Sequence, residues 1–234
     1  MTVKKLRMII NIAMTAVLLC LMSYSLIGEL THEILGVAMA VLFTVHHILN
    51  RRWFGALLKG KYRPFRILQT VLVFFLILSV LGSAVSGIIL SEHLFLFLHI
   101  EKGMSIARSV HMVCAYANYI LMSLHLGLHW NAMMSSVCKT NSDDSGIRTW
   151  IPRILAWGFA AYGIYAFIKR QIGEYLFLRT HFLFLDPTEP ILFFFLDYLA
   201  IMGLFVFFGH YLAKLMKRLD RLKGKRKDIP EKET

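Results

Sequence analysis

The chain has 234 residues, of which 57% are hydrophobic and only 17% are charged, and its mean hydropathy is +0.61. Soluble domains are about 45–50% apolar and about 25% charged, so this composition excludes a disordered chain and is unlike that of an ordinary soluble domain. Lysine and arginine exceed aspartate and glutamate by 12. In a membrane protein the position of such charges matters more than their sum, and we expect a lipid bilayer, not a nucleic acid, as the partner.

Six apolar runs account for most of the chain, and each has roughly the length of about 20 residues that a membrane-spanning helix needs. They are residues 8–27, 33–50, 67–90, 109–130, 150–168 and 191–215. The runs are continuously apolar, whereas the strands of a membrane barrel alternate over about 10 residues, so a closed barrel is excluded. We therefore predict an all-α fold, a polytopic membrane helical bundle of about six transmembrane helices.

Lysine and arginine are unevenly divided between the two sides that six spans define. With the N-terminus in the cytoplasm, 21 of them lie on the cytoplasmic side and 5 on the outer side. Such an excess is typical of cytoplasmic loops, so we predict a multi-pass protein of the cytoplasmic membrane with both termini cytoplasmic. Residues 150–215 are expected to form two additional transmembrane helices with an outer interfacial loop. Residues 216–234 are expected to form a basic cytoplasmic tail that can associate with anionic lipid.

Six of the ten histidines belong to just two of the spans, where ionisable residues are costly and usually functional. His32 and His46 of the second span are 14 residues apart, and so are His111 and His125 of the fourth. Fourteen residues at about 100° each come within about 40° of whole turns, so both histidines of a pair share a face. Their separation along the axis is about 21 Å, most of a hydrocarbon core of about 30 Å, which places one imidazole near each membrane surface.

If the two helices face each other, His32 meets His111 at the outer level and His46 meets His125 at the inner level. Each pair can then bind one haem iron axially, since cofactors of helical bundles are held by inward-facing side chains of facing helices. The pattern predicts two b-type haems in a four-helix, cytochrome b-like domain over residues 8–133. Covalent c-type attachment is not expected, because the chain has no Cys-x-x-Cys-His segment.

Two neighbouring histidines, His47 and His129, are alternates for the inner iron. His125 and His129 stand one helical turn apart, a spacing that can also bind zinc. The segment that begins at His32 lacks the second histidine of the HExxH motif, so a zinc protease is not expected.

Two further features each admit two interpretations. Asp197 lies within the last apolar run, where a carboxylate either serves proton movement or satisfies a neighbouring helix. Small residues gather at 82–87 in the third run, where they either admit a porphyrin or let two helices pack closely.

The first four spans resemble the flavinylation-associated cytochromes, bacterial membrane proteins long catalogued as a domain of unknown function. The matching motifs are His-Glu-Ile-Leu-Gly at 32–36, the stretch from His46 to Asn50 with Trp53, Ser-Gly-Ile at 86–88, and His-Leu-Gly-Leu-His-Trp at 125–130. The resemblance covers residues 8–133. It implies a b-type cytochrome that passes electrons across the membrane to extracytosolic redox partners carrying covalent FMN, and its ligand positions fall on His32, His46, His111 and His125.

We therefore expect a transmembrane di-haem b-type cytochrome, an electron-transfer subunit more than a stand-alone oxidoreductase. No G-x-G-x-x-G stands between a strand and a helix, so the electron donor is expected to be quinol or a membrane dehydrogenase. The alternative is a haem-free transporter or channel for metal ions or protons that uses the histidines as a relay. Such a protein more often carries several carboxylates at mid-membrane, and here Asp197 is the main one.

Overall fold

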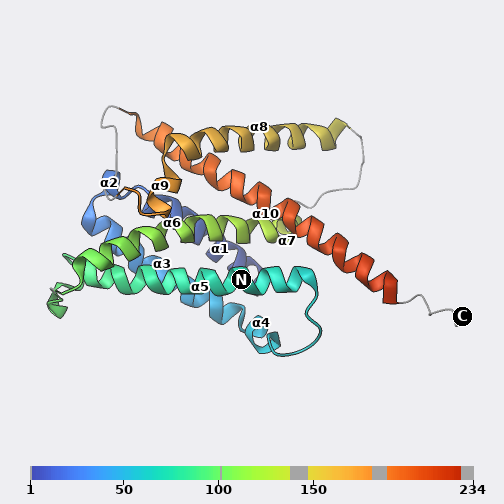
Figure 1. Ribbon diagram of the computed structural model, residues 1–234, viewed down its shortest axis with the longest axis horizontal. Coiled ribbons are helices and arrows are strands. Elements are labelled where there is room, and N and C mark those ends of the chain that lie inside the picture. Colours follow the sequence, from blue (N-terminus) through green and yellow to red (C-terminus); the bar gives the residue numbers. More distant parts are fainter. Residues whose placement is uncertain (1, 101, 138–146, 181–188, 228–234) are drawn as a thin grey trace, which may run out of the picture.

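The computed structural model describes residues 2–100, 102–137, 147–180 and 189–227, and within these ranges all regular structure is helical (Figure 1). In chain order the helices are α1 (Val3–Leu21), α2 (Tyr24–Ile27), α3 (Glu29–Leu49), α4 (Arg51–Ala56), α5 (Pro64–Leu90), the 3-10 turn η1 (Leu96–Leu98), α6 (Met104–Leu128), α7 (Trp130–Val137), α8 (Ile147–Lys169), α9 (Ile172–Leu176) and α10 (Ile191–Lys227). The all-helical fold predicted from the sequence is confirmed for the described residues.

Each predicted apolar run contains one long helix, and the helix ends follow local chemistry. Pro64 opens α5, where its missing N–H costs nothing and its fixed φ suits the first turn. Gly28 precedes α3 with a φ of 79°, a conformation that glycine adopts at little cost. The side-chain amide of Asn50 ends α3 by donating a hydrogen bond to the His46 carbonyl oxygen at 2.8 Å.

Two boundaries differ from the prediction. The first apolar run is interrupted at residues 22–23, after which α2 forms a separate short turn. The last helix does not stop at Leu215 but continues to Lys227, so the first part of the predicted tail is helical, whereas residues 228–234 lie outside the described residues. Lysine and arginine continue a helix readily, because their side chains lose little rotamer freedom in the helical conformation.

Helix α6 is the centre of the packing. It lies against α5 along its length and is crossed by α10, which in turn packs on α8 (Figure 1). Helices α1 and α3 form a pair of their own, and α3 makes only sparse backbone contacts with α5. No residue of α3 is buried, whereas α6 buries seven. The bundle therefore consists of a tightly packed part around α6 and a more loosely attached α1–α3 pair.

Glycines allow α6 and α10 to approach closely. A Cβ added at Gly127 would overlap the Val206 carbonyl oxygen, and one added at Gly209 would overlap the Leu124 carbonyl oxygen. Such small-residue contacts are typical of helix pairs in membranes. The hydrophobic effect does not drive helix association there, and close packing of the two backbones stabilises the pair instead.

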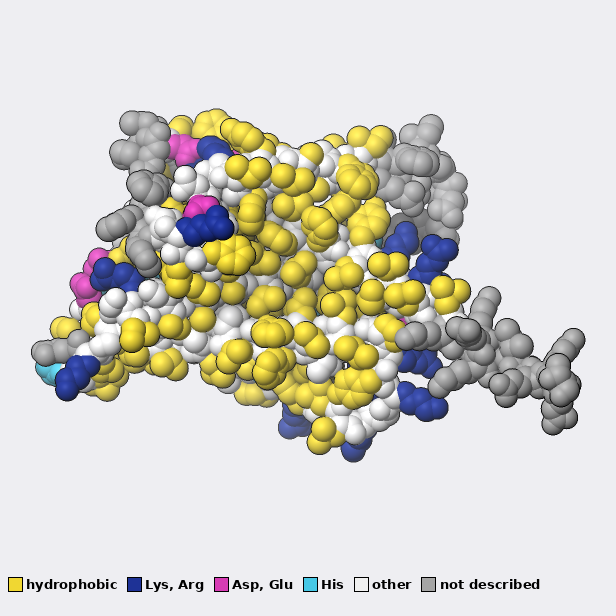
Figure 2. Space-filling model, in the orientation of Figure 1, with side chains coloured by type: hydrophobic (Ala, Val, Ile, Leu, Met, Phe, Trp, Pro, Cys, Tyr) yellow, Lys and Arg dark blue, Asp and Glu magenta, His cyan; other side chains and the backbone are white. Residues whose placement is uncertain are grey.

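Three described helices have the length and apolarity of membrane spans. They are α3, α5 and residues 191–222 of α10, while α8 adds the shorter apolar segment Ile154–Lys169. Large apolar side chains point outward from them; Phe74 of α5, for example, is 62% exposed. Figure 2 shows hydrophobic side chains over most of one face, with the charged side chains mainly toward the two ends. These are the properties of a membrane protein, whose outer surface meets lipid.

The connection between α8 and α10, on the side that the predicted topology makes the outer one, is more deeply packed than a surface loop. Its residues 172–176 form α9, where Ile172 is fully buried and Tyr175 is 3% exposed. The Tyr175 ring stacks on Tyr116 of α6 with centroids 4.9 Å apart. The remainder of the predicted interfacial stretch, residues 181–188, lies outside the described residues.

We expect Gly127→Ala to lower the free energy of unfolding by about 1–3 kcal/mol, because the added methyl group forces α6 and α10 apart. The measurement is thermal or detergent-induced unfolding of the purified protein. Gly158→Ala is the matched control, since a Cβ at Gly158 meets no atom within 4 Å. Equal stability of the two variants would contradict the close contact.

Candidate functional site

The outer ends of α3 and α6 bring two histidines close together. The rings of His32 and His111 lie with their centroids 6.1 Å apart and their planes at 69°. Two imidazoles bound to opposite sides of one metal ion, with metal–nitrogen bonds of about 2 Å, have their centroids about 6 Å apart. The spacing of this pair therefore suits axial coordination of one iron between the rings.

The orientation of His111 is fixed from α5. Its Nδ1 lies 3.1 Å from the Ser83 carbonyl oxygen and 3.2 Å from Ser86 Oγ, so the Nδ1 proton is donated to α5. This arrangement leaves Nε2 as the atom with a free lone pair, as in histidines that bind metals. Gly87 makes room for the ring, because a Cβ there would lie 3.3 Å from His111 Cε1.

A buried asparagine continues the row of polar contacts between α5 and α6 toward the middle of α6. Asn118 lies seven residues after His111 on the same face of α6, and it is 8% exposed. Its Oδ1 accepts a hydrogen bond from Ser79 Oγ at 2.5 Å, and its amide group donates to Ser83 Oγ at 3.0 Å. The small residues of α5 thus serve close helix packing and the seating of His111, the second of the two interpretations that their pattern allowed.

The inner ends of α3 and α6 carry four histidines. His46 and His47 have ring centroids 5.5 Å apart, and His125 and His129 are 4.8 Å apart. His46, His47 and His129 all lie within electrostatic range of His125. The structure thus gathers both predicted inner residues and both alternates at one end of the two helices.

Hydrogen bonds distinguish these four side chains. His46 donates from Nδ1 to Asn11 Oδ1 at 3.0 Å, which leaves its Nε2 available. His129 Nε2 lies 3.3 Å from the side-chain amide of Gln69 and is therefore engaged. His125 Nδ1 is buried and has no hydrogen-bond partner among the described residues. His46 and His125 are thus better placed to bind a metal than His129.

His47 resembles His46 in its hydrogen bonding, because its Nδ1 donates to the Phe43 carbonyl oxygen at 2.8 Å. Its ring, however, packs between Phe43 and Phe54, with centroids at 4.0 Å and 5.3 Å. In the described part of the chain no group of three or more His, Cys, Asp or Glu side chains is placed to hold a bare metal ion.

Helix α3 is the less packed of the two helices that carry the histidines. It carries His32 and His46 yet buries no residue, and a Cβ added at Gly36 would meet no atom within 4 Å. Protein interiors are normally close-packed, so α3 lies at the edge of the bundle. His32 and His46 of α3, with His111 and His125 of α6, are the residues that could hold a flat cofactor.

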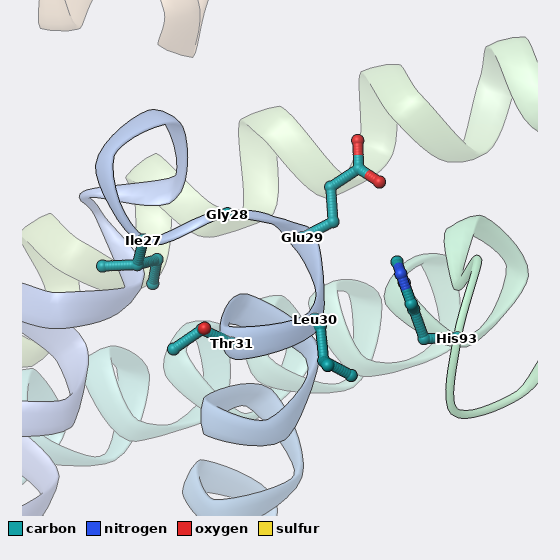
Figure 3. Close-up of a pocket in the computed structure, with 6 residues that line it drawn as sticks. All are labelled: Ile27, Gly28, Glu29, Leu30, Thr31 and His93. Carbon is teal, nitrogen blue, oxygen red and sulfur yellow. The ribbon is translucent and has the colours of Figure 1, made fainter.

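At the outer surface, a shallow hollow of about 490 Å³ opens beside the start of α3. Figure 3 shows Glu29 and His93 on one side of it and Ile27 and Thr31 on the other. His32 follows directly in the chain. The hollow thus lies at the same end of α3 as the outer histidine pair, and neither His32 nor His111 lines it.

The negative charge of Asp197 is paired with cationic side chains of the protein. Its carboxylate is fully buried and accepts hydrogen bonds from Tyr162 at 2.5 Å, Lys169 at 2.9 Å and Arg170 at 2.8 Å. Glu189 completes the cluster through Lys169 at 2.8 Å and Arg170 at 2.7 Å. Asp197 thus satisfies neighbouring groups of α8 and the segment after it, which is the structural interpretation of this carboxylate.

The second carboxylate of the cluster is held in its charged form. Burial alone would raise the pKa of Glu189, but hydrogen bonds from Lys169 and Arg170 outweigh burial and lower the pKa below its usual value. Glu189 therefore contributes stability at neutral pH that is lost as the pH falls through its lowered pKa.

Comparison of the chain with protein-family models, with curated proteins and with solved structures finds no match. The resemblance to the flavinylation-associated cytochromes stays a hypothesis that depends on the quoted motifs, and the geometry of the site has to be interpreted on its own.

Three polar residues of the site were not singled out in the sequence. Asn11 and Gln69 face His46 and His129, and Asn118 supports the seat of His111. Asn118 carried a usable signal, because it stands seven residues from both His111 and His125 and so shares their face. Asn11 and Gln69 had none, since their partners lie on other helices.

We expect Asp197→Asn to destabilise the protein by about 3–5 kcal/mol, because it removes the negative charge that pairs with Lys169 and Arg170 and replaces one acceptor oxygen by a donor NH2 group. Thermal unfolding in detergent is the measurement. Arg179→Ala is the control: it breaks an exposed pair with Glu174, at 3.4 Å, which contributes at most about 1 kcal/mol. A proton-transfer role without a structural one predicts unchanged stability for Asp197→Asn.

Proposed function

We propose that the protein is a transmembrane di-haem b-type cytochrome. The observation that carries this proposal is the 6.1 Å separation of the His32 and His111 rings, which is the separation that axial ligands of one iron need. Pairs of histidines that face each other without a shared metal would repel when protonated and would gain little from this distance. The outer haem would be held by His32 and His111 and the inner one by His46 and His125.

A bound haem supplies reversible one-electron transfer, and the histidines set where in the membrane it occurs. The α5 groups that accept the Nδ1 proton of His111 leave its Nε2 available to hold iron and would raise the basicity of that ligand. Because the two pairs lie at opposite ends of α3 and α6, the protein would transfer electrons from one membrane surface to the other.

The proposal includes six spans with both termini cytoplasmic, in the cytoplasmic membrane of a bacterium. The charge distribution supports this topology, and the helices α1, α3, α5, α6, α8 and α10 supply the six segments. Helices α1 and α6 are less apolar than α3 and α5 because they carry basic residues and buried polar residues, respectively. Such helices are stable in a membrane when their polar groups face the bundle.

The partners follow from the family resemblance and from the position of the site. Quinol or a membrane dehydrogenase would supply electrons, and an extracytosolic protein with covalent FMN would accept them. The hollow at the same end of α3 is a surface at which such an acceptor would dock.

The test is an absorbance spectrum of the purified protein, oxidised and dithionite-reduced, with the haem counted as pyridine haemochrome. We expect b-type bands and two haems per chain. A folded preparation from haem-replete cells that lacks haem would overturn the proposal and leave a metal-ion or proton transporter as the better hypothesis.

Single substitutions assign the ligands. His32→Ala and His111→Ala should each remove the same haem, and His46→Ala and His125→Ala the other, as measured by haem per protein and redox titration. His99→Ala, in the exposed outer loop, is the control and should retain both. Loss of the inner haem in His47→Ala but not in His46→Ala would reassign that ligand.

A further inference from the structure

One carboxylate ties α3 to the rest of the bundle at its outer end. Glu33 Oε1 accepts hydrogen bonds from the backbone N–H groups of Glu92 at 2.8 Å and His93 at 3.2 Å. Its Oε2 accepts from the N–H of Leu94 at 2.8 Å and from Ser91 Oγ at 2.7 Å. The loop over residues 91–94, which follows α5, is thus wrapped around a single side chain of α3.

This contact has no counterpart elsewhere on the described part of α3. The helix buries no residue, and its close backbone contacts are with α1, while those with α5 are sparse. Hydrogen bonds to a charged carboxylate are about twice as strong as neutral ones. Here one carboxylate accepts four from loop 91–94 and also lies 3.4 Å from Nδ1 of the His93 ring. The Glu33 contact therefore fixes the outer end of α3 relative to α5.

The fixed end is also the end that carries the outer site. His32 precedes Glu33 in the chain, so the two side chains leave the helix about 100° apart. Glu33 reaches the loop after α5, while His32 reaches His111 on α6, whose Nδ1 is bonded to α5. The positions of both histidines of the outer pair thus depend on α5. His111 is held by the Ser83 carbonyl group, and His32 is held through its neighbour Glu33.

We propose that Glu33 is a positioning residue of the outer site: by fastening α3 to loop 91–94, it holds His32 at the distance from His111 that one iron requires. This inference rests on the proposed function. It adds that the geometry of the outer pair is set by a carboxylate that does not touch the cofactor, and that the inner pair does not depend on it.

The test compares Glu33→Gln with Glu29→Gln in the full-length protein. Glutamine keeps the size of the side chain but replaces one acceptor oxygen by a donor, which faces backbone N–H groups. Glu29 is the matched control, because it lies in the same first turns of α3 and accepts a hydrogen bond from Tyr24 at 3.1 Å but none from the loop. We expect Glu33→Gln to weaken outer haem binding about 10-fold to 100-fold and to shift the potential of the outer haem, with the inner haem unchanged.

A second readout does not depend on haem. Hydrogen exchange, measured by mass spectrometry, should become faster at the amides of Glu92, His93 and Leu94 in Glu33→Gln and stay unchanged in Glu29→Gln. Exchange that is unaltered by Glu33→Gln overturns the contact itself. If the wild-type protein contained no haem, this readout would still test the contact, so failure of the proposed function and failure of this inference are distinguishable.

A milder variant guards against misfolding. Ser91→Ala removes one of the four hydrogen bonds from the loop side and leaves α3 intact, so it should shift the outer potential in the same direction and by less. Equal loss of both haems in Glu33→Gln, or an outer potential that moves in neither Glu33→Gln nor Ser91→Ala, overturns the positioning role.

Discussion

A polar side chain inside a lipid bilayer has to find its hydrogen-bond partner within the protein, because no water is available there. Helix α6 meets this requirement through α5: Asn118 bonds to Ser79 and Ser83, and His111 bonds to Ser83 and Ser86. The seam between these two helices is therefore both polar and close-packed. The positions of α10, α3 and the histidine pairs are all defined relative to it.

The bundle is uneven in how tightly its parts are held. Around α6, glycines bring α10 into backbone contact, and a cluster of tyrosines on α6, α9 and α10 fills the outer half of the core. On the other side, α3 presents histidines with little packing around them. In the function proposed above, burial of the two haems would supply the contacts that α3 lacks on this side.

Residue positions that depend on the geometry of a single helix were predictable from the sequence. Contacts between helices that are distant in the sequence were not. The 14-residue spacing of His32 and His46, and of His111 and His125, depends only on helical geometry. The structure has His32 near His111, and His46 within electrostatic range of His125. The ion cluster of Asp197 needed the turn after α8, and the role of Glu33 needed the loop after α5. Neither partner can be found from spacing within one helix. Helix ends were misjudged where charge follows an apolar run, as in α10, because hydropathy ends there while helix propensity does not.

The weak attachment of α3 also bears on assembly. Helices α5, α6, α8 and α10 contact one another through extensive packing, whereas α3 reaches them through histidines, a few apolar contacts and one carboxylate. A chain built in this way can complete most of its folding before any prosthetic group arrives. The α1–α3 pair would then join the bundle last, and the function proposed above would make binding of the cofactor the final step of assembly.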